Sequence, residues 1–239
     1  MREASPESLF AARLADDPAR PLLTFYDDET GERAELSAKS LANWVAKTHF
    51  LLLDEVGSAV GDRAFVSLPV HWLAAPVLFG CWFAGLEVVS SPAGADVAFG
   101  DVGGLATVDL SGVSESYAVS LLSMARSAEP PSGMSDYAAA VRPQPDSWAG
   151  VHAQARPTDA ALDGLSRSDL AASAEAAAAE LGLGPGGRLL WTSTSFGPSD
   201  WVSALLAPLT VGGSSVLIRH GDPAERDARA SSERVSVIH

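Results

Sequence analysis

The stretch of residues 61–90 is the most apolar part of the chain, and it constrains the fold more than any other feature. Residues 64–68 are a short run of strand formers. Residues 72–83 are long enough for about three helical turns, and Gly85 is typical of a helix C-terminus. Residues 87–89 predict a second strand. A strand, a helix and a strand within about thirty residues predict a βαβ unit with parallel strands.

The helix of this unit is apolar on nearly every face, so it is expected to be buried in protein or in a membrane. A membrane-spanning helix needs roughly 20 apolar residues. Here Pro69 and Glu87 bound the run, and Pro76 and Gly80 weaken it from inside. No basic cluster flanks it. We therefore expect a central crossover helix rather than a membrane anchor.

Composition excludes several classes of partner. The chain of 239 residues is 47% hydrophobic and 19% charged, which is typical of a globular protein. Its net charge of -14 repels phosphate backbones and anionic lipids, so neither nucleic acid nor a membrane surface is an expected partner. The single cysteine, Cys81, excludes a disulfide within the chain. Together with the absence of an apolar signal core at the N-terminus, this predicts a cytoplasmic protein.

The flanking segments supply further elements. Ser5 and Pro6 predict a helix start, and Ser37 predicts another after a hairpin that spans residues 21–36. Downstream of the central unit, the expected elements are strands at 96–99 and 107–110 and a helix at 117–128. Residues 143–145, Pro-Gln-Pro, are typical of a linker and predict a boundary there.

The second half of the chain repeats the pattern of the first. Leu36-Ser37 recurs as Leu165-Ser166, each before a helix, and a glycine turn, a strand, a helix and a strand follow in both halves. We therefore predict an α/β protein with two similar parallel-sheet, flavodoxin-like subdomains packed together and an N-terminal hairpin. The expected domains are residues 1–145 and residues 146–239.

The order of these motifs resembles the start of the acyl-adenylate-forming, or AMP-binding, enzymes. In both, a hairpin leads into a Leu-Ser helix, then Gly61-Asp62-Arg63, a strand, Leu68-Pro69, and a helix that closes in Ala84-Gly85. Residues 183–188 and the segment 195–199 are similar to later parts of the family. The resemblance touches nearly all of this chain but only the earlier part of the family's large N-terminal domain.

One departure bears on the activity that the resemblance implies. The family binds the phosphates of ATP with a Thr-Ser-Gly-Thr-Thr-Gly-x-Pro-Lys-Gly loop, which should follow the pair matched here by Asp159-Ala160. Instead, residues 161–164 lead straight into Leu165-Ser166. The only lysines, Lys39 and Lys47, precede this point, so neither the loop lysine nor the family's later catalytic lysine is expected.

The chain ends at His239, after a predicted strand at 234–238. The family's Tyr-Gly-x-Thr-Glu segment, its ribose-binding Asp and its mobile C-terminal domain would all come later, so we expect none of them here.

One stretch is a candidate anion site. Its residues lie between a predicted strand and a predicted helix, where backbone amides and the helix dipole favour an anion. They are Thr192, Ser193, Thr194, Ser195 and Gly197. The internal repeat places the stretch opposite residues 67–72, which favours an ordinary connection instead. No histidine spacing predicts a metal site, and His71 is interpreted as a packing or capping residue. We expect no catalytic residue, metal or cofactor.

Three functional hypotheses remain open. The first is a non-catalytic relative of the adenylate-forming enzymes with a binding or regulatory role, whose partner is an unknown small molecule or protein. The second is a subunit that completes an acyl-adenylating site with a partner. The third is an enzyme of another class that uses a cleft between the subdomains. A homo-oligomer is compatible with each of them.

Overall fold

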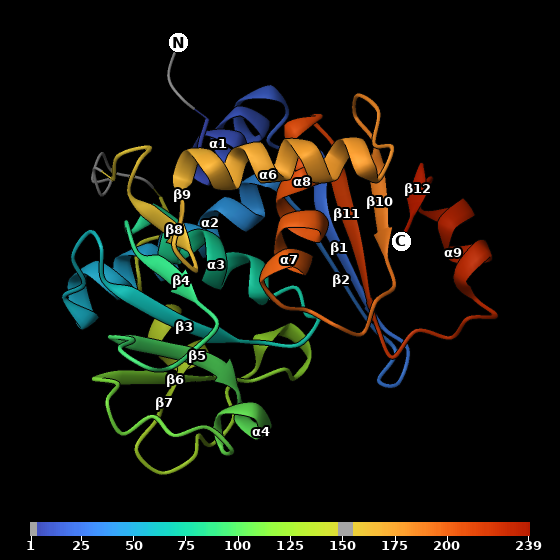
Figure 1. The fold of residues 1–239 in the computed structure, drawn as a ribbon. Coiled ribbons are helices and arrows are strands. Elements are labelled where there is room, and N and C mark those ends of the chain that lie inside the picture. The colour runs from blue at the N-terminus through green and yellow to red at the C-terminus, as the bar shows by residue number, and fades with distance from the viewer. Residues whose placement is uncertain (1–3, 148–154) are drawn as a thin grey trace. The chain divides into compact units, whose positions relative to one another are not determined.

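The computed structural model describes residues 4–147 and 155–239, which form an α/β fold with two largely parallel sheets (Figure 1). Sheet A has the order β12-β10-β11-β1-β2, and sheet B has the order β7-β6-β5-β3-β4-β8-β9. The strands of sheet A are β1 (Pro21–Asp27), β2 (Glu32–Ser37), β10 (Arg188–Trp191), β11 (Ser214–Arg219) and β12 (Val237–Ile238). Those of sheet B are β3 (Arg63–Ser67), β4 (Glu87–Val89), β5 (Val97–Asp101), β6 (Glu115–Val119), β7 (Ser135–Asp136), β8 (Ala160–Leu162) and β9 (Leu165–Ser166). The predicted fold class is confirmed.

The helices lie between these strands in the chain. The α-helices are α1 (Pro6–Asp16), α2 (Ala38–Phe50), α3 (Ala74–Phe83), α4 (Val102–Leu105), α5 (Tyr137–Val141), α6 (Arg167–Glu180), α7 (Pro198–Trp201), α8 (Ala207–Thr210) and α9 (Arg226–Ser232). A π-helical segment, Leu51–Val56, extends α2, and another, Val202–Leu206, joins α7 to α8. Among the residues described here, every helix is too short or too polar to cross a bilayer.

The central unit forms as its apolar pattern predicts. β3 and β4 pair in parallel, with Arg63 opposite Glu87, and α3 connects them. Every residue of α3 from Ala74 to Trp82 is buried. Gly85 has a φ of +87° and ends the helix, because the amide of Leu86 donates to the carbonyl of Cys81 and that of Gly85 to Trp82.

Hydroxyl side chains start two of the other helices. The amide of Ser8 donates to Ser5 Oγ at 3.2 Å at the start of α1, and that of Ser40 donates to Ser37 Oγ at 3.1 Å at the start of α2. These bonds satisfy amides that have no partner within their own helix. The two helix starts predicted from the sequence are therefore confirmed.

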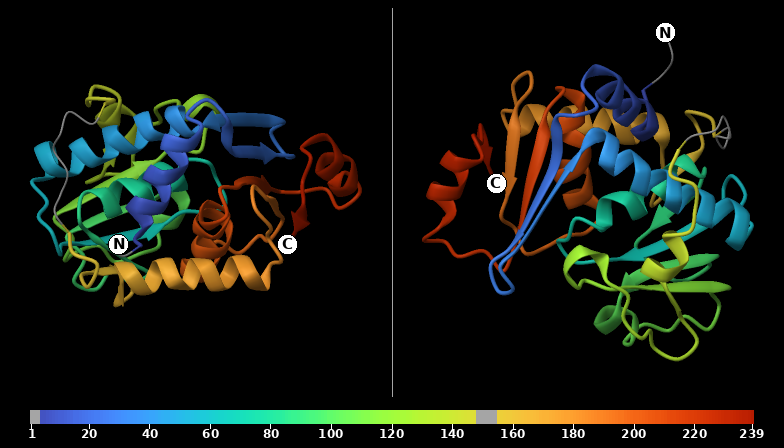
Figure 2. Two further views of the ribbon diagram at one scale, coloured as in Figure 1. Left: turned by 90° about the horizontal axis from the view of Figure 1, so that it is seen from above. Right: turned by 180° about the vertical axis from the view of Figure 1, so that it is seen from behind.

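The internal repeat is visible as the same order of elements in both halves: hairpin, helix, strand, helix, strand. The hairpins, however, are exchanged between the sheets. β1 of the first hairpin pairs in parallel with β11, and β8 of the second hairpin pairs in parallel with β4. Figure 2 shows the β1–β2 hairpin lying along sheet A when the molecule is seen from behind.

The compact units of the structure are not divided at residue 145, where the sequence predicted a boundary. One compact unit consists of Met1–Leu41, Val70–Trp72 and Ser168–His239, and the other of Ala42–Pro69 and Leu73–Arg167. The Pro-Gln-Pro segment lies inside the second unit rather than in a linker. There, Lys47 Nζ donates to the carbonyl of Gln144 at 2.6 Å, and the Gln144 side chain donates to the carbonyl of Ala140 at 3.3 Å.

Two predicted elements are wrong. The residues expected as a helix at 117–128 begin instead with strand β6, because Tyr117, Ala118 and Val119 pair in parallel with β5 in sheet B. A short 3₁₀ turn, Ser123–Ala125, follows that strand. The strand expected at 107–110 is a turn and irregular chain. Its apolar residues, Val108 and Leu110, pack on the sheet without pairing to it.

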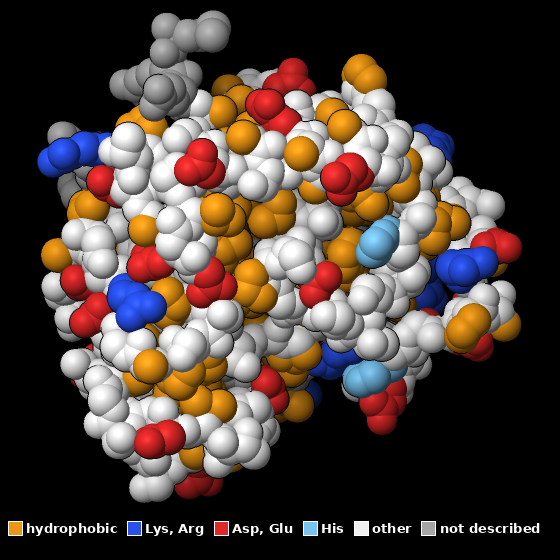
Figure 3. Space-filling view, viewed as in Figure 1, with side chains coloured by type: hydrophobic (Ala, Val, Ile, Leu, Met, Phe, Trp, Pro, Cys, Tyr) orange, Lys and Arg blue, Asp and Glu red, His pale blue; other side chains and the backbone are white. Residues whose placement is uncertain are grey.

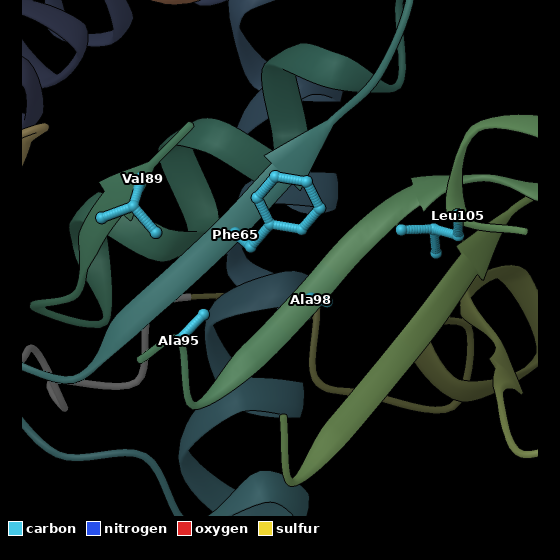
Figure 4. Packing of buried hydrophobic residues seen from close by; sticks show 5 residues of the cluster. All are labelled: Phe65, Val89, Ala95, Ala98 and Leu105. Atoms are coloured by element: carbon cyan, nitrogen blue, oxygen red, sulfur yellow. The ribbon is translucent and has the colours of Figure 1, made fainter. Parts of the chain in front are cut away.

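Each sheet carries a hydrophobic cluster. On sheet B, Phe65, Val89, Ala95, Ala98 and Leu105 pack together (Figure 4). On sheet A, Leu190, Val216 and Ile218 are covered by Ala230 of α9 and by Val235. On the other face of sheet A lie α6, α7 and α8 (Figure 1). Figure 3 shows acidic side chains spread over the displayed surface without gathering into a single patch.

Candidate functional site

The loop of residues 192–197 leaves the carboxyl end of β10 and enters α7, as its candidate role as an anion site requires. Its first residue is tied to the end of β12, because the amide and Oγ1 of Thr192 both donate to the carbonyl of His239, at 2.8 and 2.7 Å. The amide of Ser195 donates to Ser193 Oγ at 3.2 Å, and Thr194 is exposed. The structure therefore turns Thr192 toward a neighbouring strand rather than toward a common anion position.

The remaining donors of the loop bind a carboxylate of the chain itself. Asp200 Oδ2 accepts hydrogen bonds from the amide of Gly197 and from Ser195 Oγ, each at 2.8 Å. Asp200 lies in the first turn of α7, where a negative charge interacts favourably with the amide end of the helix. The position that a bound anion would take relative to Ser195 and Gly197 already holds a negative charge.

A similar arrangement occurs where the resemblance places the family's phosphate loop. β8 and β9 are joined directly by Asp163 and Gly164, which have φ values of +43° and +84°. Positive φ at both positions is typical of a type I′ hairpin turn, for which Asp-Gly is a preferred sequence. The amide of Gly164 donates to Glu87 Oε1 at 2.7 Å, and the amide of Ser90 donates to Asp163 Oδ1 at 2.9 Å. Hydrogen bonds therefore hold this tight turn against Glu87 of β4 and against Ser90, the residue after β4.

A polar cluster that the sequence analysis missed lies at the carboxyl edge of sheet A. Asp27 ends β1, and Arg219 ends the adjacent strand β11 directly opposite. Arg219 donates from Nη2 and Nε to Asp27 Oδ2, at 2.6 and 3.2 Å. His220 Nδ1 lies 2.8 Å from Asp27 Oδ1, and the amide of Glu29 donates to the same oxygen at 3.1 Å.

The charges of this cluster follow from its surroundings. The Asp27 side chain is fully buried, whereas that of His220 is 49% exposed. Burial raises the pKa of the Asp27 carboxyl group, but hydrogen bonds from Arg219 and His220 outweigh it and hold that pKa well below its ordinary value. Asp27 is therefore ionised at neutral pH.

His71 lies beside this cluster. Its ring is buried and packs on Phe25, with ring centroids 4.6 Å apart. Burial, assisted by the positive charge of Arg219, lowers the pKa of His71 to about 3. A neutral, buried imidazole packed on an aromatic ring supports the packing role expected from the sequence.

One sequence signal could have located the cluster. Asp27 and His220 each lie at or just after the end of a predicted strand. In open α/β sheets, residues at the carboxyl ends of parallel strands meet at one edge, which is where ligands bind. What the sequence did not show is that β1 and β11 are neighbours. Within the described residues, no group of three or more His, Cys, Asp and Glu side chains is placed to hold a metal ion.

Comparison with a curated protein decides the family. The chain is 39% identical over 231 residues to a TIGR03089 family protein of Mycobacterium tuberculosis strain H37Rv, with 94% of this chain and 93% of that protein covered. This chain belongs to the TIGR03089 family. No family model matches the sequence.

Comparison with solved structures shows the fold of the present chain. It is similar to an acyl-CoA synthetase of Brucella canis, with a TM-score of 0.75, 17% identity, and coverage of 98% of this chain and 46% of that one. The N-terminal domain of FACL13 from Mycobacterium tuberculosis gives a TM-score of 0.71 at 14% identity, with 97% of this chain and 61% of that one covered. The anthranilate CoA ligase AuaEII, solved with anthranoyl-AMP, gives 0.72 at 14%, with 98% and 48% covered.

The fold of the TIGR03089 chain is thus that of the N-terminal domain of AMP-binding ligases, as its motif order implied. The chain spans about half the length of the Brucella canis synthetase and of AuaEII. At these identities the likeness concerns the fold alone.

Proposed function

We propose that this protein is non-catalytic as a ligase and uses the AMP-ligase scaffold for binding or regulation. The observation that supports this most is the Asp163-Gly164 turn. It replaces the phosphate loop of the resembled family, and the amide of Gly164 already donates to Glu87. Transfer of a nucleotidyl group depends on positive charge and free donors placed where negative charge develops. Here the carboxylate of Glu87 accepts the hydrogen bond that the amide of Gly164 donates.

The loop of residues 192–197 supports the same proposal. The donors of Ser195 and Gly197 bind Asp200, so a phosphate group there would have to displace a bonded carboxylate. Each charge-assisted hydrogen bond lost in this way removes about 1.5–3 kcal/mol of affinity. The net charge of -14 adds long-range repulsion of a polyanion. We therefore expect ATP and AMP to bind weakly or not at all.

Two measurements test this proposal. Purified protein should show no acid-dependent ATP–pyrophosphate exchange above a heat-inactivated control. A ligand present at 100 times its dissociation constant stabilises a fold by about 2.7 kcal/mol, which raises the melting temperature of a chain of this size by several degrees. Millimolar ATP, with or without magnesium, should therefore leave the melting temperature unchanged.

Substitutions in the loop of residues 192–197 and at Asp200 give a sharper test. A clear shift with ATP that disappears when Thr192, Ser193 and Thr194 are replaced together by Ala would contradict the proposal and restore the loop as an anion site. Asp200→Asn is the matched variant, because it removes the charge but keeps a side chain of the same size. If the carboxylate is what excludes anions, ATP should stabilise Asp200→Asn more than the parent.

The lengths of the matched proteins favour a second candidate function. The curated relative is covered over 93% of its length, whereas the acyl-CoA synthetase of Brucella canis is covered over 46%. A subunit that completes an adenylating site with a partner protein would have this relation to a whole ligase. Purification of the native complex separates the two candidates, since only the second requires a stoichiometric partner whose addition creates acid-dependent exchange.

A further inference from the structure

His220 is held in one orientation by a buried carboxylate. β1 and β11 are parallel neighbours with Asp27 opposite Arg219, so the next residue, His220, comes to the same edge of sheet A. An ionised carboxylate can only accept hydrogen bonds, so Nδ1 of His220, 2.8 Å from Asp27 Oδ1, carries the proton. In the neutral form of the ring, Nε2 is then the atom with a free lone pair.

The exposure of the ring makes that atom available. The His220 side chain is 49% exposed, and within the described part of the chain Nε2 has no hydrogen-bond partner. The backbone of His220 has a φ of +52°, in the left-handed region that side chains other than glycine seldom adopt. Such strain costs on the order of 1–3 kcal/mol and clusters at functional sites.

The neighbouring charges decide which ligand suits the ring. Arg219 is paired with Asp27 at 2.6 Å, and Arg229 is paired with Asp28 at 2.8 Å. Glu29 Oε2 lies 3.1 Å from Nδ1 of His220, but its side chain is 71% exposed, so water weakens its effect. His71 is buried and neutral. With both nearby arginines paired and Glu29 adding negative charge, the edge favours a neutral ligand over a phosphate ester.

We propose that Asp27 and His220 form a general-base dyad that activates water toward small, neutral carboxylic esters. Nε2 of His220 accepts a proton from water as the water oxygen bonds to the acyl carbon. The carbon–oxygen bond to the alcohol then breaks, the leaving oxygen takes the electron pair, and the imidazolium releases its proton to solvent. Asp27 is the positioning residue, because it sets the tautomer and the angle of the ring. The reaction of the dyad needs no ATP, so its test is independent of whether the protein has ligase activity.

Steady-state hydrolysis of p-nitrophenyl acetate tests the dyad. His220→Asn is the primary variant, because Asn tolerates the left-handed backbone and removes only the imidazole. His239→Asn is the matched control, because His239 is also an exposed histidine at this edge of sheet A. Its ring stacks on Trp191, with centroids 4.3 Å apart, whereas the ring of His220 is hydrogen-bonded to a carboxylate. General bases contribute about 10²–10⁴-fold in enzyme sites. For this open site we expect His220→Asn to lower the turnover rate at least about tenfold and His239→Asn to leave it unchanged.

Turnover must be separated from a single acylation of Lys39, Lys47 or the terminal amine, so only release beyond one equivalent counts. Equal turnover in the parent and His220→Asn would overturn the proposal. Asp27→Asn should lower turnover as well, but it removes a buried ion pair and can unfold the chain. A measurement on the parent avoids this difficulty: nitrogen-15 NMR should show His220 protonated at Nδ1 at neutral pH. A ring protonated at Nε2 alone would exclude the dyad.

Discussion

The indole Nε1 atom of Trp82 donates a hydrogen bond to the carbonyl oxygen of Ala161 at 2.9 Å. Trp82 lies in α3 and Ala161 in β8, so this bond joins the central helix to the hairpin that β4 receives from the second half of the chain. Arg167 strengthens the same junction, because its Nη1 donates to the carbonyl of Trp82 at 3.0 Å and its Nη2 to that of Leu86 at 3.2 Å. The exchange of hairpins is thus secured by side chains far apart in the sequence.

Trp82→Ala should lower the free energy of unfolding by about 3–5 kcal/mol, because the indole is fully buried and its loss leaves a cavity. Trp82→Phe keeps most of the volume but leaves the carbonyl of Ala161 without this donor, so a loss of about 1–3 kcal/mol is expected. Urea unfolding measures both. Val60→Ala is the control, since Val60 is 45% exposed and its truncation should change little. A Trp82→Ala protein that unfolds like the parent would show that the core is wrongly assigned.

Gly80→Ala should be destabilising because α2 and α3 approach too closely for a methyl group. A Cβ atom at Gly80 would lie 2.5 Å from Cβ and Cγ2 of Thr48, whose own Oγ1 is bonded to the hydroxyl of Tyr137 at 2.7 Å. Overpacking of this kind costs about 1–3 kcal/mol. Gly184→Ala is the matched control, because nothing lies within 4 Å of its Cβ position. Equal melting temperatures for the two variants would refute the close packing.

The stability that Asp27 contributes should depend on pH in one direction. Its pKa is raised by burial but held well below the ordinary value by hydrogen bonds from Arg219 and His220. A carboxyl group whose folded pKa is depressed stabilises the fold above its unfolded pKa, about 3.9, and loses that effect as the pH falls further. The difference in unfolding free energy between the parent and Asp27→Asn should therefore stay constant from pH 7 to about 5 and shrink below about 4. Denaturant unfolding across this range checks it, and a difference that does not vary with pH would contradict the pairing.

The thiol of Cys81 should be unreactive in the folded protein. Cys81 is fully buried in α3, and burial raises its pKa well above the ordinary value, so almost none of it is the reactive thiolate at neutral pH. Reaction with an aromatic disulfide reagent should thus proceed only as fast as the protein opens. Adding denaturant should accelerate it by orders of magnitude. A rapid reaction of native protein at pH 8 would mean that α3 is not the buried helix described here.

Local patterns in the sequence predicted several of the elements correctly. The apolar run from Ala74 to Trp82, ended by Gly85, produced α3, and Ser5 and Ser37 produced the starts of two helices. These features depend on neighbours within a few residues, where side-chain volume, capping and backbone preference act directly. The motif order also predicted the AMP-ligase fold, because that order follows the chain.

The errors occurred where distant segments decide the outcome. Residues 117–119 include two strand-forming types, Tyr117 and Val119, and they form a strand because they pair in parallel with β5. The compact units are not divided at residue 145, because each hairpin pairs with a strand of the other half, which no local pattern encodes.

The candidate site shows the same division. The sequence alone predicted a candidate anion site at 192–197, which stays a prediction, and showed that the family's phosphate-loop motif does not follow Asp159-Ala160 and that no lysine follows Lys47. Folding of the whole chain brings the Glu87 carboxylate to the amide of Gly164, 77 positions away, whereas the bond between Asp200 and Gly197 is local to the start of α7. Folding also brings Asp27 and His220, 193 positions apart, to within 2.8 Å. The physical reason is that strand order, which is set by packing of the whole chain, chooses which charges meet at the edge of a sheet.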